Sequence, residues 1–201
     1  MSSPRVLLSL PKVDFGQVRQ QVRAFVWRPQ VHVVEVGSPT KIAPYALAIE
    51  AELDPDGDRE AASGRLIVLH DPAGNDAWEG EFRCVSLAQA DVDLAMATDP
   101  CLNEVGWSWL TDALNRAGCD YVAESGTVTT ITGRGFGGLA AQPARAEIEI
   151  RSSWTPVFTG APDIRPHLEA WQHLLCLVAG VAPLPDEVAE LRRRLDDGRP
   201  S

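Results

Sequence analysis

The side chains best suited to chemistry gather around His70 and Asp71, with Asp76 and Glu79 shortly after them. An imidazole beside carboxylates is the composition of a general acid–base pair or of part of a metal site, if the side chains converge from a rigid element. No third ligand follows at a useful spacing. Residues 71–75 (DPAGN) are also ordinary turn sequence, in which an aspartate accepts hydrogen bonds from backbone amides. We therefore favour a structural turn here.

A glycine-rich stretch, residues 133–138 (GRGFGG), is the second candidate. Its backbone amides could cradle an anion, with Arg134 adding positive charge. A dinucleotide-binding loop needs a strand before it and a helix after it, whereas the sequence after this loop predicts another strand. We favour a flexible hairpin loop, in which Phe136 either inserts into the core or is exposed to a partner.

Large aromatic residues are the third group of candidates. Trp109 lies on the apolar stripe of a predicted central helix, whereas Trp107 lies beside the stripe and either packs over the sheet edge or lines a partner groove. No Ser or Cys is placed in a nucleophile elbow or beside a recognisable base, so we predict no catalytic residue. Because aromatic and arginine side chains anchor many interfaces, we expect a binding surface made of Trp107, Arg134, Phe136 and Trp154.

The composition limits the classes of function. The chain has 201 residues and a formal net charge of −10, with an isoelectric point of about 4.8. A protein that binds nucleic-acid phosphates needs a basic surface, so we expect no nucleic-acid partner. No apolar run is as long as a membrane span, and the first ten residues lack the cleavage pattern of a signal peptide. We therefore expect a cytoplasmic protein with no membrane partner.

The four cysteines are scattered along the chain and form no C-x-x-C pair: Cys84, Cys101, Cys119 and Cys176. Zinc sites and disulfide frameworks need closer or more regular spacing, so we predict reduced thiols, no metal and no cofactor. Arginines gather within residues 19–28 and 192–194, and we interpret each group as a solvated helix face.

The elements that must position these residues are organised around residues 98–139. Thr98 or Asp99 can cap the start of a central helix, and Gly118 can end it. A strand with a bulge expected at Gly126 follows, and then the glycine-rich loop. Between the two ends of the helix, apolar residues recur at helical spacing: Leu102, Val105, Trp109, Leu110, Ala113 and Leu114.

Patterns in the rest of the chain predict a mixed fold. Residues 45–53 are ambiguous: their alanines suit a helix, but apolar and polar residues alternate as in a strand with one solvated face, and we favour the strand. The other elements are expected as a helix at 13–27, a short strand or edge segment at 31–36, a polar loop at 54–64, strands at 65–71, 78–91, 120–132 and 145–154, a helix at 166–180 and a short charged helix at 186–195.

Several phrases, taken together and in order, are specific: GRLIVLHDPAGNDAWEGEFRCV, MATDPCLNEVGWSWLTDAL, SGTVTTITGRGFGGL, and AEIEIRSSWTP followed by HLEAWQHLLC. They resemble an uncharacterised family of high-GC Gram-positive bacteria (actinobacteria) that is catalogued as a domain of unknown function. The resemblance covers about residues 42–180 and implies no activity, cofactor or catalytic residue. The element order also looks like the secretion-chaperone-like fold, whose members are often dimers that hold other proteins.

We expect one α+β domain at residues 13–180, followed by a short charged tail at 181–201. The domain is expected to be an antiparallel sheet of about five strands with helices on one face, in the order α-β-β-β-α-β-β-α. The function we favour is a non-enzymatic protein-binding or regulatory module that forms a homodimer. The alternative is a small-ligand binder or enzyme with a pocket between the central helix and the sheet, served by Asp71, Glu104 and Arg134.

A structure discriminates between these two functions. A deep pocket with converging polar groups would favour the ligand binder or enzyme. A filled core with an exposed apolar strip would favour the protein-binding module.

Overall fold

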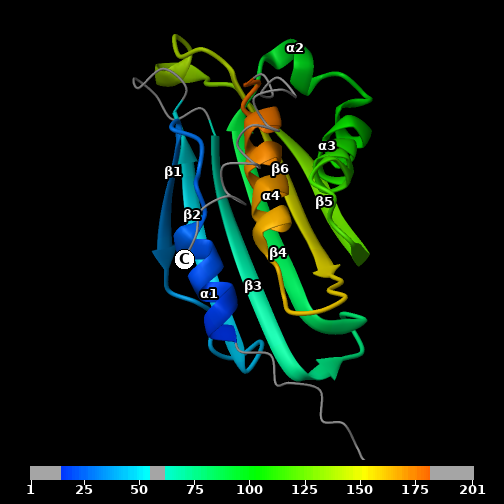
Figure 1. Cartoon of the computed structure of the whole chain (residues 1–201). Coiled ribbons are helices and arrows are strands. Elements are labelled where there is room, and N and C mark those ends of the chain that lie inside the picture. The colour runs from blue at the N-terminus through cyan, green and yellow to red at the C-terminus, as the bar shows by residue number, and fades with distance from the viewer. Residues whose placement is uncertain (1–14, 55–61, 182–201) are drawn as a thin grey trace, which may run out of the picture.

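Six antiparallel strands form one sheet in the order β1-β2-β3-β4-β6-β5, with helices along one of its faces (Figure 1). This computed structural model describes residues 15–54 and 62–181. The strands are β1 (Val31–Val36), β2 (Tyr45–Leu53), β3 (Ala62–Asn75), β4 (Gly80–Asp91), β5 (Tyr121–Gly133) and β6 (Arg145–Pro156). The helices are α1 (Phe15–Ala24), α2 (Leu94–Ala97), α3 (Leu102–Arg116) and α4 (Arg165–Val178), with a 3-10 turn, η1 (Gly137–Leu139).

The α+β class and the antiparallel sheet are as predicted, but the sheet has one strand more than expected. Residues 45–53 form a strand, as their alternation indicated. The additional strand is β1, because residues 31–36 were expected as a short strand or edge segment and were not counted among the strands of the sheet. It pairs with β2 along its whole length, from Val31 opposite Leu53 to Val36 opposite Ala48, since its β-branched residues suit an extended backbone.

Alternation along the strands gives the sheet one buried face. Neighbours in register across β2, β3, β4 and β6 are buried together, as in the row Leu47, Val68, Cys84 and Trp154. The helices α1, α3 and α4 lie against this face (Figure 1), and their apolar residues join the strands in one hydrophobic cluster. None of these three helices covers the opposite face of the sheet.

The last long helix, α4, contributes much of this core. Its apolar face is buried as predicted, through Leu168, Trp171, Leu174, Leu175 and Val178. His167 is also buried. Its Nδ1 accepts a hydrogen bond from Nε1 of Trp154 (3.1 Å), and its ring lies edge-on to Phe158. The imidazole therefore supplies the hydrogen-bond acceptor that the buried indole N–H of Trp154 needs. A helical pattern in the sequence does not reveal this role.

The central helix, α3, starts later than predicted. A separate short helix, α2, forms before it, and Asp99 bridges the two by accepting a hydrogen bond from the backbone N–H of Cys101 (2.8 Å). The helix ends as expected at Gly118, whose φ of +69° is a left-handed conformation that glycine adopts without strain.

The buried side of α3 is close to the predicted stripe. Leu102, Leu110 and Leu114 are buried, as expected. Val105 is instead 41% exposed, and its neighbour Gly106 occupies a buried position against the sheet. The buried stripe is therefore rotated slightly, away from Val105 and towards Gly106. The glycine lets the helix approach β5 and β6 closely.

Two expectations about the strands are wrong in detail. The turn expected at residues 72–76 lies later, because β3 continues to Asn75 and β4 begins at Gly80. The bulge expected at Gly126 lies earlier, between Val122 and Ser125. In β3 the register with β4 is irregular between His70 and Asn75, whereas β5 pairs regularly with β6 through Gly126.

Some expectations fall outside the described residues. They are the start of the first helix at residues 13 and 14, most of the loop at 54–64, and the charged helix at 186–195 with its arginines. The division of the chain into a domain and a tail stays a prediction.

Candidate binding surface on the uncovered face of the sheet

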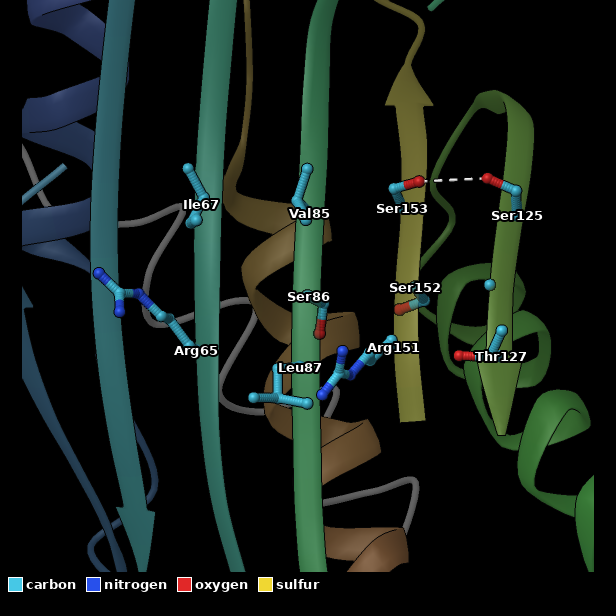
Figure 2. Close-up of a pocket in the computed structure, with 11 residues that line it drawn as sticks. Arg65, Ile67, Val85, Ser86, Leu87, Ser125, Thr127, Arg151, Ser152 and Ser153 are labelled. Atoms are coloured by element: carbon cyan, nitrogen blue, oxygen red, sulfur yellow. Dashed lines mark hydrogen bonds between the residues drawn. The ribbon is translucent and has the colours of Figure 1, made fainter. Parts of the chain in front are cut away.

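The face of the sheet opposite the helices holds a hollow of about 550 Å³ (Figure 2). Its floor is aliphatic and comes from the two central strands: Ile67 of β3 and Val85 and Leu87 of β4. Ile67 is paired with Val85, so the floor is continuous across the two strands. All three side chains are half-buried, which leaves apolar surface open to a partner.

The two central strands are apolar on both faces. In β3, Leu66 and Val68 point towards the helices, whereas Ile67 and Leu69 alternate with them on the uncovered face. Strands of this kind are usual where both faces of a sheet are covered. Here α1, α3 and α4 cover only one face, so within residues 15–54 and 62–181 no helix lies over the apolar floor of the hollow.

Two arginines flank the floor. Arg65 of β3 makes an ion pair with Glu50 (3.3 Å) and donates a hydrogen bond to the carbonyl oxygen of Gly37 (3.1 Å). Arg151 of β6 makes an ion pair with Glu149 (2.7 Å between Nε and Oε1). Each guanidinium therefore has a carboxylate of its own on the same face of the sheet. These pairs hold the arginines beside the floor.

A third arginine, Arg83, fixes the end of the hollow next to β5. It is buried and donates hydrogen bonds to the carbonyl oxygen of Ala123 (2.8 Å) and to the hydroxyls of Thr155, Ser125 and Ser153 (3.1, 3.2 and 2.7 Å). Burial lowers the pKa of its guanidinium, and Cys84 and Glu79 act in the opposite direction. Arginine stays charged in proteins even so. Arg83 thus ties β4, β5 and β6 together at the bulge.

The lining of the hollow suits binding. Ser125 and Ser153 lie within 3.2 Å of each other across β5 and β6, and Thr127 follows on the same face (Figure 2). Hydroxyl and guanidinium groups can donate hydrogen bonds to the carbonyl or carboxylate oxygens of a partner. The aliphatic floor can contact its apolar side chains. Together they can hold a segment of mixed polar and apolar character.

The four residues expected to form an aromatic binding surface do not form one. Trp154 is fully buried under α4, so it is not part of any surface. Trp107 is half-buried and packs over Gly126, where a Cβ would lie 2.8 Å from the indole ring. Arg134 is exposed and Phe136 is 77% exposed, both beyond the end of β5. Only the last two are free to meet a partner.

The alternative polar site is not assembled either. Asp71 lies towards the β3–β4 turn, where its carboxylate accepts a hydrogen bond from the backbone N–H of Ala73 (3.0 Å). Glu104 is exposed in the first turn of α3, which lies towards the other end of the sheet (Figure 1). These two carboxylates therefore cannot act on the same ligand.

His70 is a packing residue in this structure. Its ring is fully buried and stacks on Phe82 (4.2 Å between centroids), with Phe15 and Tyr45 on its other sides. Its nearest carboxylate, of Glu81, is 3.9 Å away, which is too far for a hydrogen bond, and neither ring nitrogen has a partner. Burial lowers the pKa of His70, which favours the neutral ring.

The central helix packs closely on the sheet at Gly106. A Cβ on Gly106 would lie 2.9 Å from a methyl group of Val128 and 3.3 Å from one of Ile148. A Cβ on Gly126 would lie 2.3 Å from the carbonyl oxygen of Arg151. A methyl group has no free space at Gly106, where α3 meets β5 and β6, or at Gly126, where β5 meets β6, so the pocket expected between α3 and the sheet does not extend to these points.

Across residues 15–54 and 62–181, no group of three or more His, Cys, Asp or Glu side chains is arranged to hold a metal ion. Within the same part of the chain, no helix has the length and apolar character needed to cross a membrane.

Sequence reasoning missed the residues of the hollow. The signal was present in RLIVLHD (residues 65–71), where the four apolar residues 66–69 follow one another without the alternation expected of a sheet with one solvated face. A continuous run indicates that the second face is also apolar.

Comparisons with known proteins identify a family but no activity. Residues 11–189 match the model of a family described as "Protein of unknown function (DUF3000)". No curated protein and no solved structure matches the chain.

Proposed function

The chain belongs to the DUF3000 family, whose description assigns no activity, and we propose that it is a protein-binding module. The uncovered face of the sheet is the docking surface. An extended or irregular segment of another protein lies across the hollow, with apolar side chains on the floor and backbone carbonyls towards the arginines and hydroxyls.

The observation that carries this proposal is the aliphatic floor. Ile67, Val85 and Leu87 lie side by side on a face that no helix of the described part of the chain covers, and the arginines that flank them are already paired with carboxylates. Contiguous exposed apolar surface with a polar rim is typical of protein interaction sites. A partner that covers the floor gains the free energy of burying it, about 25 cal/mol per Å².

A small ligand in the same hollow is the second candidate function. The volume of about 550 Å³ lies in the usual range for ligand sites. Such sites bury most of the ligand, however, whereas this hollow lies along a sheet face (Figure 2). A protein segment that spans several strands fits that shape better than a compact molecule does.

Other parts of the proposal come from the sequence. They are a cytoplasmic location, an actinobacterial source, a regulatory role without catalysis, and a homodimer. The likeness of element order to the secretion-chaperone-like fold, whose members often hold other proteins as dimers, supports the same function by analogy only.

The test is capture of partners by tagged protein from its host, followed by mass spectrometry. The variant Leu87→Lys places a charge on the floor, and Val105→Lys places the same charge on an exposed aliphatic position of α3. We expect Leu87→Lys to lose a partner that wild type and Val105→Lys both retain, with all three folded by circular dichroism. Equal capture by the three proteins would contradict the proposal.

A small molecule that co-purifies with wild type would favour the second candidate. The discriminating result is its loss in Leu87→Lys without the loss of any protein.

A further inference from the structure

The two edges of the sheet differ in how they are protected. Edge strands expose unpaired backbone groups that attract other strands, and charged residues or bulges usually block this. The edge strand β1 is six residues long, and its Glu35 makes ion pairs with Arg19 and Arg23 of α1. At the opposite edge β5 is thirteen residues long, and its only bulge lies at its start, between Val122 and Ser125.

Beyond that bulge, β5 is regular and carries no charge. Residues 125–133 (SGTVTTITG) pair with β6 in unbroken register, and no ionisable side chain occurs among them. Thr127, Thr129 and Ile131 alternate on the uncovered face of the sheet and are exposed. This stretch has the β-branched composition that favours strands, so it is an open template for one more strand.

We infer that the free edge of β5 binds β5 of a second copy of this chain, in an antiparallel pair centred on Thr129. The regular stretch is symmetric about that residue, so all nine of its positions find partners. Val128 then lies opposite Thr130 of the second copy. Ile131 lies opposite Thr127 of the second copy. Each apolar residue faces a threonine, and no like charges are opposed.

The flanking charges fix the register of this pair. Glu124 and Arg134 are equally far from Thr129, on opposite sides, and both are exposed. Glu124 lies in the bulge and Arg134 follows the last residue of β5, so the antiparallel pair brings the end of one copy that carries Glu124 beside the end of the other that carries Arg134, twice. Threonine-rich strands slip easily in register, so charges at both ends are what specifies one alignment.

Charge also selects this edge over other surfaces. A chain with a net charge of −10 repels its own copy at most orientations. The nine uncharged residues of β5 and their flanking opposite charges avoid that repulsion. Phe136, which is 77% exposed, reaches the same end of the pair as Val122 of the second copy, which is 37% exposed.

The inference deepens the homodimer part of the proposed function and rests on it. It does not use the floor of the hollow, so both hollows stay open in a dimer whose sheet is continuous across the two copies. Failure of the dimer and failure of partner capture are therefore separate results.

Sedimentation of the full chain over a range of concentrations tests the inference. Thr129→Lys places two lysines opposite each other at the centre of the pair, and we expect it to weaken the dimer about tenfold or more. Val34→Lys, at an exposed position of the other edge strand, adds the same charge and is expected to leave the dimer unchanged. A monomeric wild type at high micromolar concentration, or equal weakening by both variants, would overturn the inference.

Charge reversal tests the alignment itself. Glu124→Arg and Arg134→Glu each place like charges opposite each other twice, and each is expected to weaken the dimer about tenfold. The double variant Glu124→Arg with Arg134→Glu restores opposite charges and is expected to restore the wild-type dissociation constant. A double variant as weak as the single variants would overturn the pairing centred on Thr129.

Discussion

Acidification is expected to destabilise this protein through His167. Burial is the main cause that lowers the pKa of this histidine, to about 4, and the carboxylates of Asp163 and Asp120 act in the opposite direction. In the unfolded chain the same group has a pKa of about 6.5. Between these two values the unfolded state binds more protons than the folded state, so the free energy of unfolding falls as the pH falls through that window.

The magnitude follows from the two pKa values. A separation of about two and a half pKa units lowers the free energy of unfolding by about 3 kcal/mol once the pH is below both pKa values. At pH 4.5 the loss is already about 2–3 kcal/mol. In His167→Gln this titration is absent, and the amide oxygen can still accept the hydrogen bond from Trp154. The stability difference between wild type and variant is therefore expected to shrink by that amount between neutral pH and pH 4.5.

Urea unfolding followed by circular dichroism at several pH values measures this difference. All ionisable groups other than His167 are common to the two proteins, so their contributions cancel in the comparison. A constant difference between wild type and His167→Gln across the window would refute the reasoning.

Three further predictions concern the core and the composition of the protein. Leu110→Ala should lower the free energy of unfolding in urea by about 2–5 kcal/mol, because Leu110 is buried in the middle of the helix. Val105→Ala, at an exposed position of the same helix, is the control and should change it by less than about 1 kcal/mol. Gly126→Ala should destabilise the protein by about 1–3 kcal/mol or more in the same assay, because the added methyl group meets the carbonyl oxygen of Arg151. A Gly126→Ala variant as stable as wild type would contradict this. Elemental analysis of the purified protein should find no stoichiometric zinc or iron, and about one metal per chain, lost in His70→Ala, would contradict this.

Most of the fold was predictable because its elements carry strong periodic signals. The alternation in residues 45–53 and the wide apolar face of α4 both identified the correct structure. The short helix α2 was missed, since four residues are too few to show a helical period. The strand β1 was undercounted because six residues without clear alternation do not distinguish a paired strand from an extended edge.

The candidate site was less predictable for a physical reason. Trp154 appeared to be a surface anchor because it stands near the end of a strand, but register places it beside Cys84 on the buried face. Ile67 and Leu87 were not singled out as surface residues, because the strand pattern does not say which face of a sheet the helices cover. That choice depends on how α1, α3 and α4 pack after the sheet has formed, which is a property of the whole chain.

Covalent capture at the floor of the hollow tests the central claim most directly. Val85 is replaced by a photoreactive phenylalanine analogue, with the same replacement at Val105 of α3 as the control, and each protein is irradiated in its host. Because Val85 lies in the floor and Val105 lies away from it, we expect a distinct cross-linked protein only from position 85. Cross-links of equal pattern and yield from both positions, or none from position 85, would contradict the account.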